Sequence, residues 1–296
     1  LLKETHLINT PAREKIRNKI VRDAVKKAKK AKGKQPDAFI KAGGASAGKG
    51  AVDTRMRESG AIKEGTVEIN ADLIKEQLPE YKNFIDAGDP RWAEFLHEES
   101  AMLANRMKDE LRTKKADFVF DRVLPNPDKA TELIKELQAA GYKVHLIGVT
   151  IDPAEAVVRS ITRFSQNNRL VPPQVLLKGH KNVAQHFEEY AALADDVELY
   201  NNSTKLEVIA VKNEGEELVP LNKLRYDEFV AKGNINEKAN TLNEILPKSR
   251  ERAGDAADSQ GPGRPGSLAG RQGQPDPGGP GTPPPVSGTK RVTSSW

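Results

Sequence analysis

The fold is decided by the stretch Gly43-Gly44-Ala45-Ser46-Ala47-Gly48-Lys49-Gly50. An apolar run, residues 38–40, precedes it, and a segment compatible with a helix follows it. Glycines at both ends of such a turn let successive backbone N–H groups point inward, and the next helix offers its positive N-terminus to an anion. In this arrangement Lys49 reaches the β- and γ-phosphates. The whole stretch therefore predicts a phosphate-binding loop for a nucleoside triphosphate, and the alternative is a flexible Gly/Ala turn that begins a helix.

Gly50 departs from the usual pattern of such a loop. It occupies the position at which Ser or Thr normally gives its hydroxyl to Mg²⁺, and Ala51 does not replace it. The chain resembles small nucleoside monophosphate kinases in this respect, because they also tolerate Gly after the loop lysine. That resemblance implies ATP with a Mg²⁺ ion held through water and phosphate oxygens. A degenerate loop that only binds nucleotide is the alternative.

Strand-like and helix-like segments alternate through the middle of the chain. Short apolar or β-branched runs predict strands at residues 37–42, 66–70, 117–121, 143–151, 197–200 and 206–211. Among the helical segments, a long apolar stripe runs from Trp92 to Leu111, and a shorter one from Leu133 to Leu137 ends before Gly141. The pattern predicts an α/β fold, a P-loop NTPase-type three-layer sandwich whose mostly parallel sheet has helices on both faces.

Composition places an extension at each end of this core. Eleven Lys or Arg and only two acids lie between Arg13 and Lys34, so this one predicted helix has a surplus of positive charge larger than the net charge of the whole chain, +5. Residues 251–296 contain ten of the 23 Gly and eight of the 19 Pro, with almost no large apolar residues, which predicts disorder. We therefore expect a basic helical extension at residues 1–35, a P-loop domain at residues 36–246 and a disordered tail at residues 247–296.

The basic helix has one apolar side. That side consists of Ile16, Ile20, Val21, Ala24, Val25 and Ala28. We expect it to dock on the core or on a partner. Binding of nucleic acid or an acidic membrane by the lysines is the second interpretation, but a charged helix face is usually only solvated, so nucleic acid is not an expected partner.

Several classes of protein and site are excluded by residue content. The chain has no Cys, which excludes disulfides, thiolate metal sites and cysteine nucleophiles, and its five His show no metal-ligand spacing. No apolar run reaches the length of a membrane span, and the first residues lack the apolar region of a signal peptide. We expect a cytoplasmic protein without membrane contact.

Two acids follow predicted strands, at the sheet edge where ligands bind in such folds. Asp72 comes after the strand at 66–70, and Asp121 ends the strand at 117–121. One such carboxylate can accept the proton of an acceptor hydroxyl, while another holds Mg²⁺ directly or through water. The structural alternatives are a helix N-cap for Asp72 and a turn or an ion pair with Arg122 for Asp121.

Arginines supply the positive charge that phosphoryl transfer requires. Arg159 and Arg163 lie four residues apart on one predicted helix, and Arg169 begins a segment able to fold over ATP. Fixed cations stabilise the charge spread over the transferred phosphate. A solvated arginine face is the alternative.

With these residues assembled, the chain resembles the zeta-toxin family of P-loop kinases. The resemblance runs from about residue 37 to residue 200 and rests on the glycine loop, on residues 69–81 around Asp72, and on two pieces that contain Arg163 and Arg169. It implies ATP-dependent phosphorylation, in characterised members of the 3′-hydroxyl of UDP-N-acetylglucosamine, and an antitoxin as a protein partner. In that family Asp72 would be the base, Lys49 would bind phosphate, and Arg163 and Arg169 would stabilise the transferred phosphate.

Two departures from the family pattern concern the acceptor. Asn70 stands where the family often has Asp, and Asp121 is followed by Arg122-Val123-Leu124-Pro125 instead of a run resembling Gly-Thr-Gly-Arg. Because these positions help to bind the acceptor in the family, ATP is the firmer expectation and the nucleotide sugar the weaker one. Two other functions stay open: a P-loop kinase of a nucleotide, nucleoside or antibiotic, and a non-catalytic nucleotide-binding or structural module of a phage or mobile-element protein.

Overall fold

The computed structural model describes residues 9–31, 34–122, 124, 126–167, 169 and 171–246. The predicted disorder of residues 247–296 lies outside the described residues. The strands are β1 (Asp37–Ala42), β2 (Val67–Asn70), β3 (Phe118–Arg122), β4 (Lys143–Thr150), β5 (Asp196–Asn201), β6 (Glu207–Lys212) and β7 (Val219–Pro220). The helices are α2 (Pro11–Val25), α3 (Lys49–Glu58), α4 (Ala71–Lys75), α5 (Pro79–Asp86), α6 (Trp92–Phe95), α7 (His97–Lys114), α8 (Pro127–Ala139), α9 (Pro153–Asn167), α10 (Pro173–Leu193) and α11 (Lys223–Ala231), with short 3₁₀ turns at Lys232–Asn234 and Leu242–Glu244.

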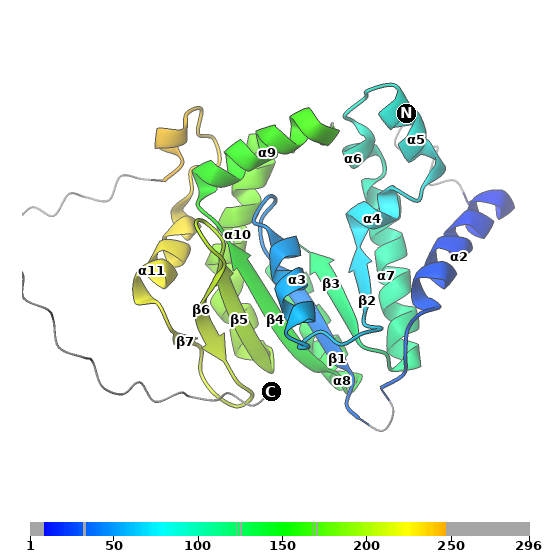
Figure 1. Cartoon of the computed structure of the whole chain (residues 1–296), viewed down its shortest axis with the longest axis horizontal. Coiled ribbons are helices and arrows are strands. Elements are labelled where there is room, and N and C mark those ends of the chain that lie inside the picture. The colour runs from blue at the N-terminus through cyan, green and yellow to red at the C-terminus, as the bar shows by residue number, and fades with distance from the viewer. Residues whose placement is uncertain are drawn as a thin grey trace, which may run out of the picture. The chain divides into compact units, whose positions relative to one another are not determined.

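The strands form a seven-stranded sheet in the order β2-β3-β1-β4-β5-β6-β7 (Figure 1). The first five strands in this order are parallel, while β6 and β7 pair antiparallel to their neighbours. The six predicted strands are present, which confirms a mostly parallel sheet. The two-residue strand β7 was not predicted, because two residues are too few to show an alternation of apolar and polar side chains.

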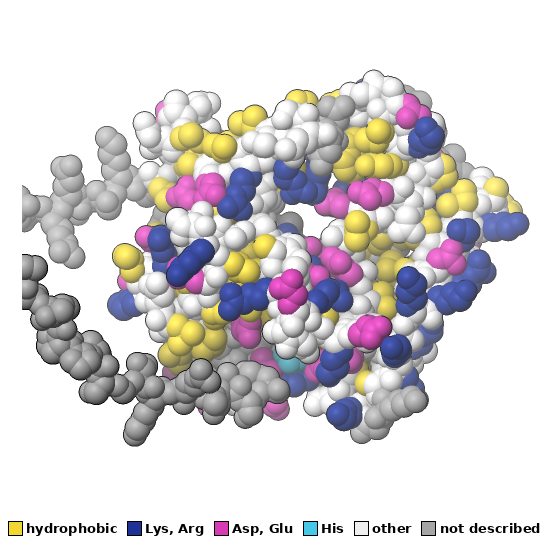
Figure 2. Space-filling model, in the orientation of Figure 1, with side chains coloured by type: hydrophobic (Ala, Val, Ile, Leu, Met, Phe, Trp, Pro, Cys, Tyr) yellow, Lys and Arg dark blue, Asp and Glu magenta, His cyan; other side chains and the backbone are white. Residues whose placement is uncertain are grey.

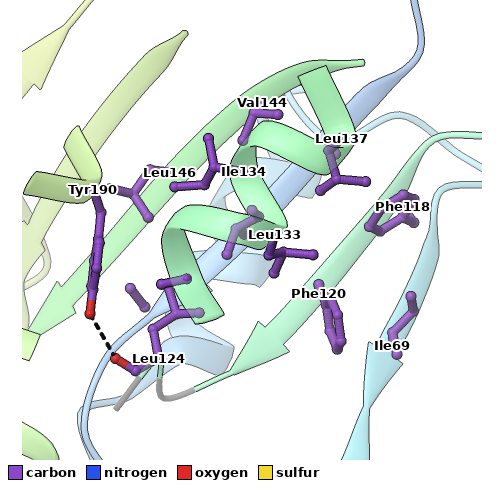
Figure 3. Packing of buried hydrophobic residues seen from close by; sticks show 14 of the residues in the cluster. Ile69, Phe118, Phe120, Leu124, Leu133, Ile134, Leu137, Val144, Leu146 and Tyr190 are labelled. Carbon is purple, nitrogen blue, oxygen red and sulfur yellow. Dashed lines mark hydrogen bonds between the residues drawn. The ribbon is translucent and has the colours of Figure 1, made fainter. Parts of the chain in front are cut away.

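Alternate strand residues enter two separate cores, one on each face of the sheet. Ala38 and Ile40 of β1 pack in a core with α7, α8 and α10, whereas Phe39 between them packs with α3 on the opposite face. Figure 3 shows the side chains of α8 lying on the strands of the first core. A parallel sheet buried on both faces in this way is the predicted three-layer sandwich.

The predicted stripe at 92–111 is divided between two helices. Leu96 separates α6 from α7, because its φ of −90° and ψ of 3° depart from α-helical values. Leu103, Met107 and Leu111 of α7 are buried, so this stripe serves the core. The stripe of α8 ends as predicted, with Gly141 at φ +83° directly after the C-cap.

The basic helix α2 docks on the domain through its predicted apolar side. Ile20, Val21 and Val25 are buried in the same core as α7. Lys and Arg side chains line the outer edge formed by α2 (Figure 2). No helix in the described ranges combines the length and the apolar character needed to cross a membrane.

Candidate active site

The glycine loop, residues 43–50, connects β1 to α3 as the sequence predicts. Gly48 is the N-cap of α3 and has φ +89°, a conformation that favours glycine. Ser46 has φ +62°, which is uncommon for a residue with a side chain. The positive end of α3 therefore follows a tightly wound turn, as a phosphate site requires.

Three side chains bind alternate carbonyl oxygens of the glycine loop. Lys49 Nζ donates to the oxygen of Gly43 (2.9 Å), and two residues outside the loop, His180 and Asn202, donate to Ala45 (2.9 Å) and Ala47 (3.1 Å). Carbonyls held from outside leave the intervening N–H groups for an anion inside the turn. His180 and Asn202 are thus parts of the loop's support, although the sequence analysis assigned no role to them.

His180 lies in α10 and is almost completely buried, at 3% exposure. Burial lowers the pKa of its imidazole to about 4, and the nearby charges of Lys232 and Lys49 act in the same direction. The ring is therefore neutral at physiological pH, and its Nε2–H donates to the Ala45 carbonyl. A neutral imidazole adds no charge beside the predicted phosphate-binding loop.

Lys49 and Asp121, which the sequence placed in one site, are brought together. Lys49 Nζ lies 3.4 Å from Asp121 Oδ1, and each side chain is 15% exposed. The alternative ion pair of Asp121 with Arg122 is absent from the described residues; the Arg122 guanidinium lies over the ring of Phe120 instead.

Lys41 on β1 was missed by the sequence analysis. Its side chain is 2% exposed, and its Nζ lies 3.2 to 3.4 Å from carboxylates of Asp53, Glu68 and Asp121. Burial favours the neutral amine, but the three carboxylates outweigh burial and raise the pKa of Lys41. A sequence signal was present, because Lys41 is the one charged residue in the otherwise apolar run 38–42. A charge in a buried strand has to be paired, so Lys41 indicated nearby acids.

Asp72 is the second residue of α4 and does not cap it. The cap is Asn70, whose side-chain oxygen accepts from the backbone N–H of Asp72 at 3.0 Å. The carboxylate of Asp72 forms an ion pair with Arg169 and another with Lys75 at 3.2 Å. Burial alone would raise the pKa of Asp72, but Arg169, Lys75 and Lys49 together lower it. The N-cap alternative for Asp72 is therefore wrong.

The two predicted arginines reach the glycine loop. Arg163 and Arg169 line a small pocket whose other residues are Ala45, Ser46, Ser160 and Val171. Arg159 bonds Glu155 and the carbonyl of Asn202, and its Nη1 atom lies 3.6 Å from the position that a Cβ atom at Gly48 would take, so it also lies beside the loop. Helix α9 stands on one side of the carboxyl ends of the strands and α4 on the other (Figure 1), and acidic and basic side chains are close together between them (Figure 2).

The residues present fit a Mg²⁺ ion that is held mainly by substrate. In the described ranges no group of three or more His, Cys, Asp or Glu is arranged to hold a metal. Mg²⁺ in phosphate sites commonly takes one or two carboxylates and completes its shell with phosphate oxygens and water. Asp121, the carboxylate closest to Lys49, is suited to be that ligand.

Comparison with known families identifies the domain. The family described as Zeta toxin matches residues 22–214, which is more than half of the chain. The chain belongs to the zeta-toxin family. The match includes the glycine loop, Asp72 and both arginines, so the resemblance found in the sequence is confirmed.

Two solved structures resemble the fold of this zeta-toxin family member. The AvrRxo1-ORF1:-ORF2 complex with ATP matches with a TM-score of 0.63 and 20% identity, over 77% of this chain and 75% of that chain. The PezAT toxin-antitoxin system of Streptococcus pneumoniae matches with a TM-score of 0.55 and 17% identity, over 68% of this chain and 82% of that chain. These likenesses confirm the fold.

One curated protein with a similar sequence is the calmodulin calcium-dependent NAD kinase of Arabidopsis thaliana. It is 23% identical over 155 residues, which cover 50% of this chain. The match spans 29% of the length of that relative.

Proposed function

We propose that this zeta-toxin family member is an ATP-dependent kinase that phosphorylates a sugar hydroxyl of a nucleotide-linked acceptor, with UDP-N-acetylglucosamine as the first candidate. One observation carries the proposal: an acid and two arginines from separate segments converge on the glycine loop. Arg169 pairs with Asp72, and Arg169 and Arg163 line a pocket with Ser46 of the loop. A positioned base and fixed cations are what phosphoryl transfer needs.

The roles follow from position. Lys49 binds the β- and γ-phosphates, and Arg163 and Arg169 stabilise the transferred phosphate. Asp121 would hold Mg²⁺, which would supply positive charge against the charge that develops on the phosphates. Asp72 accepts the proton of the acceptor hydroxyl.

The ion pair of Asp72 with Arg169 affects how strong a base Asp72 is. Arg169 lowers the pKa of Asp72, so the carboxylate is a weak base while the pair persists. The phosphates of ATP carry more negative charge than one carboxylate and compete for the guanidinium. Once Arg169 moves to phosphate, the pKa of Asp72 rises and the carboxylate becomes a better base.

A second acceptor, a hydroxyl of a dinucleotide such as NAD, is favoured by the similarity to a plant NAD kinase. Like UDP-N-acetylglucosamine, NAD contains a sugar attached to a pyrophosphate. An antitoxin is the proposed protein partner, because one similar structure belongs to a toxin-antitoxin system.

The test is an acceptor panel. The purified chain is incubated with ATP, Mg²⁺ and UDP-sugars, NAD, nucleosides or aminoglycosides, and products are examined for the mass gain of one phosphate. We expect a UDP-sugar or NAD to gain the mass of one phosphate, and we expect this product to be absent when EDTA is in excess. If a nucleoside or an aminoglycoside were phosphorylated faster than the UDP-sugars and NAD, the proposed acceptor class would be wrong. If no compound gained a phosphate, the alternative of a non-catalytic nucleotide-binding module would be favoured.

A further inference from the structure

Lys232 lies in the 3₁₀ turn that follows α11, beyond the residues 22–214 that match the family. Helix α11 packs beside α10 and β6 (Figure 1). Lys232 is buried, at 4% exposure, and its Nζ atom donates to the hydroxyl of Thr150 (2.5 Å) and to the carbonyl of Ile151 (2.6 Å). Both acceptors lie at the carboxyl end of β4, the edge of the sheet at which the glycine loop begins.

The ammonium group of Lys232 is a buried charge that its surroundings do not neutralise. Among the described residues its contacts are the two hydrogen bonds at the end of β4, and no carboxylate pairs with it. Burial lowers its pKa to about 8; the charges of Asp152 and Glu228 oppose this shift only in part, and Arg225 adds to it. A charge removed from water without a paired anion costs free energy, and such perturbed groups are concentrated at functional sites.

Thr150 connects Lys232 to the glycine loop. Its carbonyl accepts from the backbone N–H of Asn202 at 2.8 Å, and the side-chain amide of Asn202 donates to the carbonyl of Ala47 at 3.1 Å. Thr150 is therefore held by Lys232 through its side chain and holds Asn202 through its backbone. An unbroken series of hydrogen bonds leads from the ammonium group to the loop.

The 3₁₀ turn itself is fixed on α10, the helix behind the glycine loop. Gln185 of α10 donates to the carbonyl of Gly233 at 2.8 Å, and Lys181 of α10 forms an ion pair with Glu237 at 3.1 Å. The same helix contacts the loop through His180. The turn and the loop thus rest on one helix.

The charge of Lys232 acts on the side chain that contacts the loop. Burial is the main cause of the low pKa of His180, and the charge of Lys232 lowers this pKa further, by more than the charge of Lys49 does. Lys49 is the lysine of the loop itself, and His180 contacts the loop at Ala45. In a site with a low dielectric constant, a cation this close adds to the positive potential that attracts phosphate.

We infer that Lys232 is a positioning residue of the nucleotide site, which holds the glycine loop through Thr150 and Asn202 and contributes a buried positive charge that favours the phosphates of ATP. The inference rests on the proposed function in taking the loop as the ATP site. It makes the segment after residue 214 a part of that site and not an appendage of the family domain.

The test measures binding of a non-hydrolysable ATP analogue with Mg²⁺ by calorimetry, without turnover. The variants are Lys232→Met, Thr150→Val and the control Lys223→Met. Lys223 is a suitable control because it lies in α11, has a side chain that is 83% exposed and pairs with Asp227 on the same helix. Each protein is measured at about pH 7.5 and at about pH 9.5, on either side of the pKa of Lys232, and its melting temperature is recorded without nucleotide.

At about pH 7.5 we expect Lys232→Met to weaken binding of the analogue about tenfold, because it removes a nearby charge that water screens only in part. Thr150→Val should weaken binding less, since the Ile151 carbonyl still holds the ammonium group. Lys223→Met should match the unmodified chain.

The pH dependence separates this role from a purely structural one. As the pH rises from about 7.5 to about 9.5, the folded chain loses the proton of Lys232, whereas the unfolded chain, with the ordinary pKa of 10.5, retains it. Loss of the buried charge should therefore raise the melting temperature and, at the same time, weaken binding of the analogue. Lys232→Met lacks this proton and should lack both contributions. A lysine that served stability alone would change the melting temperature without changing the affinity.

The inference would be overturned if Lys232→Met bound the analogue as tightly as the unmodified chain at about pH 7.5, or if both affinities depended on pH in the same way. Absence of binding by the unmodified chain would also overturn it. If Lys232→Met does not fold, the unmodified chain decides, because an affinity that does not fall toward about pH 9.5 contradicts the inference. Failure of the kinase proposal looks different: binding then depends on Lys232, but no phosphate is transferred when ATP replaces the analogue.

Discussion

The Nε2 atom of His180 in α10 lies 2.9 Å from the carbonyl oxygen of Ala45, so a buried imidazole supports the glycine loop from outside. The same ring occupies the space that a Cβ atom at Gly44 would need. The loop is therefore shaped by the helix behind it as well as by its own glycines. Two predictions follow directly from this contact.

His180 should make the stability of the domain fall in mild acid. Its pKa is about 4 in the folded chain against an ordinary value of 6.5, so the unfolded chain binds more protons between these values. The stabilisation is complete above about pH 6.5 and is lost as the pH falls toward 4, amounting to about 3 kcal/mol. In His180→Gln the melting temperature should change less between pH 6.5 and pH 4.5 than it does in the unmodified chain. His97→Gln, at an exposed position, is the control. If the melting temperature of His180→Gln depended on pH as that of the unmodified chain does, the prediction would be contradicted.

Gly44→Ala should reduce ATP affinity and the melting temperature, because the added methyl group overlaps the His180 ring. The cost of overpacking a buried site is about 1–3 kcal/mol. Gly50→Ala is the matched comparison for stability: no atom lies within 4 Å of its Cβ position, and alanine favours the first turn of α3. Differential scanning calorimetry and nucleotide titration measure both effects. Equal melting temperatures for the two variants would show that the contact does not restrict the loop.

The sequence predicted the sheet and the loop because both depend on local patterns. Apolar runs at regular intervals gave the six longer strands, and the glycines marked the turn after β1. Contacts between distant segments were not predictable: Asn202, directly after β5, and His180 of α10 both reach the loop. Asp72 was offered as a possible cap because Asp is a good N-cap, but Asn70 begins the helix two residues earlier. Arg159 and Arg163 have helical spacing, yet Arg159 bonds Glu155 and the Asn202 carbonyl, whereas Arg163 lines the pocket at Ser46.

Lys49→Ala should abolish phosphate transfer and leave the fold intact. Lys49 Nζ contacts the Gly43 carbonyl and Asp121, and the side chain is not part of either hydrophobic core. Its loss removes the point charge on the phosphates. Lys82→Ala, at a side chain 78% exposed, is the control. Circular dichroism checks the fold, and product mass checks transfer; transfer near the unmodified rate would refute the role of Lys49.

The docking of α2 should depend on a buried ion-pair cluster. Glu99 of α7 is completely buried and accepts from Arg13 at 2.8 Å and from Arg17 at 2.7 Å. Glu99→Gln removes the buried negative charge that Arg13 and Arg17 share. Glu80 still pairs with Arg13 and Glu14 with Arg17, so the cost should not exceed the about 3–5 kcal/mol of breaking a buried ion pair. Lys19→Met breaks an exposed pair with Asp23 and should cost less than about 1 kcal/mol. Urea unfolding measures both, and a small effect of Glu99→Gln would mean that α2 is held by its apolar side alone.

Asp72→Asn is the most direct test of the proposed chemistry. Asn70 caps α4, so the substitution leaves the cap in place, and it removes the carboxylate that pairs with Arg169. We predict an unchanged fold, ATP binding at least as tight as before, and phosphate transfer slower by about 10²- to 10⁴-fold, the usual contribution of a general base. The measurement is single-turnover transfer from ATP to the acceptor that the panel identifies, with Asp86→Asn in α5 as the control. Transfer by Asp72→Asn at close to the unmodified rate would contradict the account, because the base would then lie elsewhere.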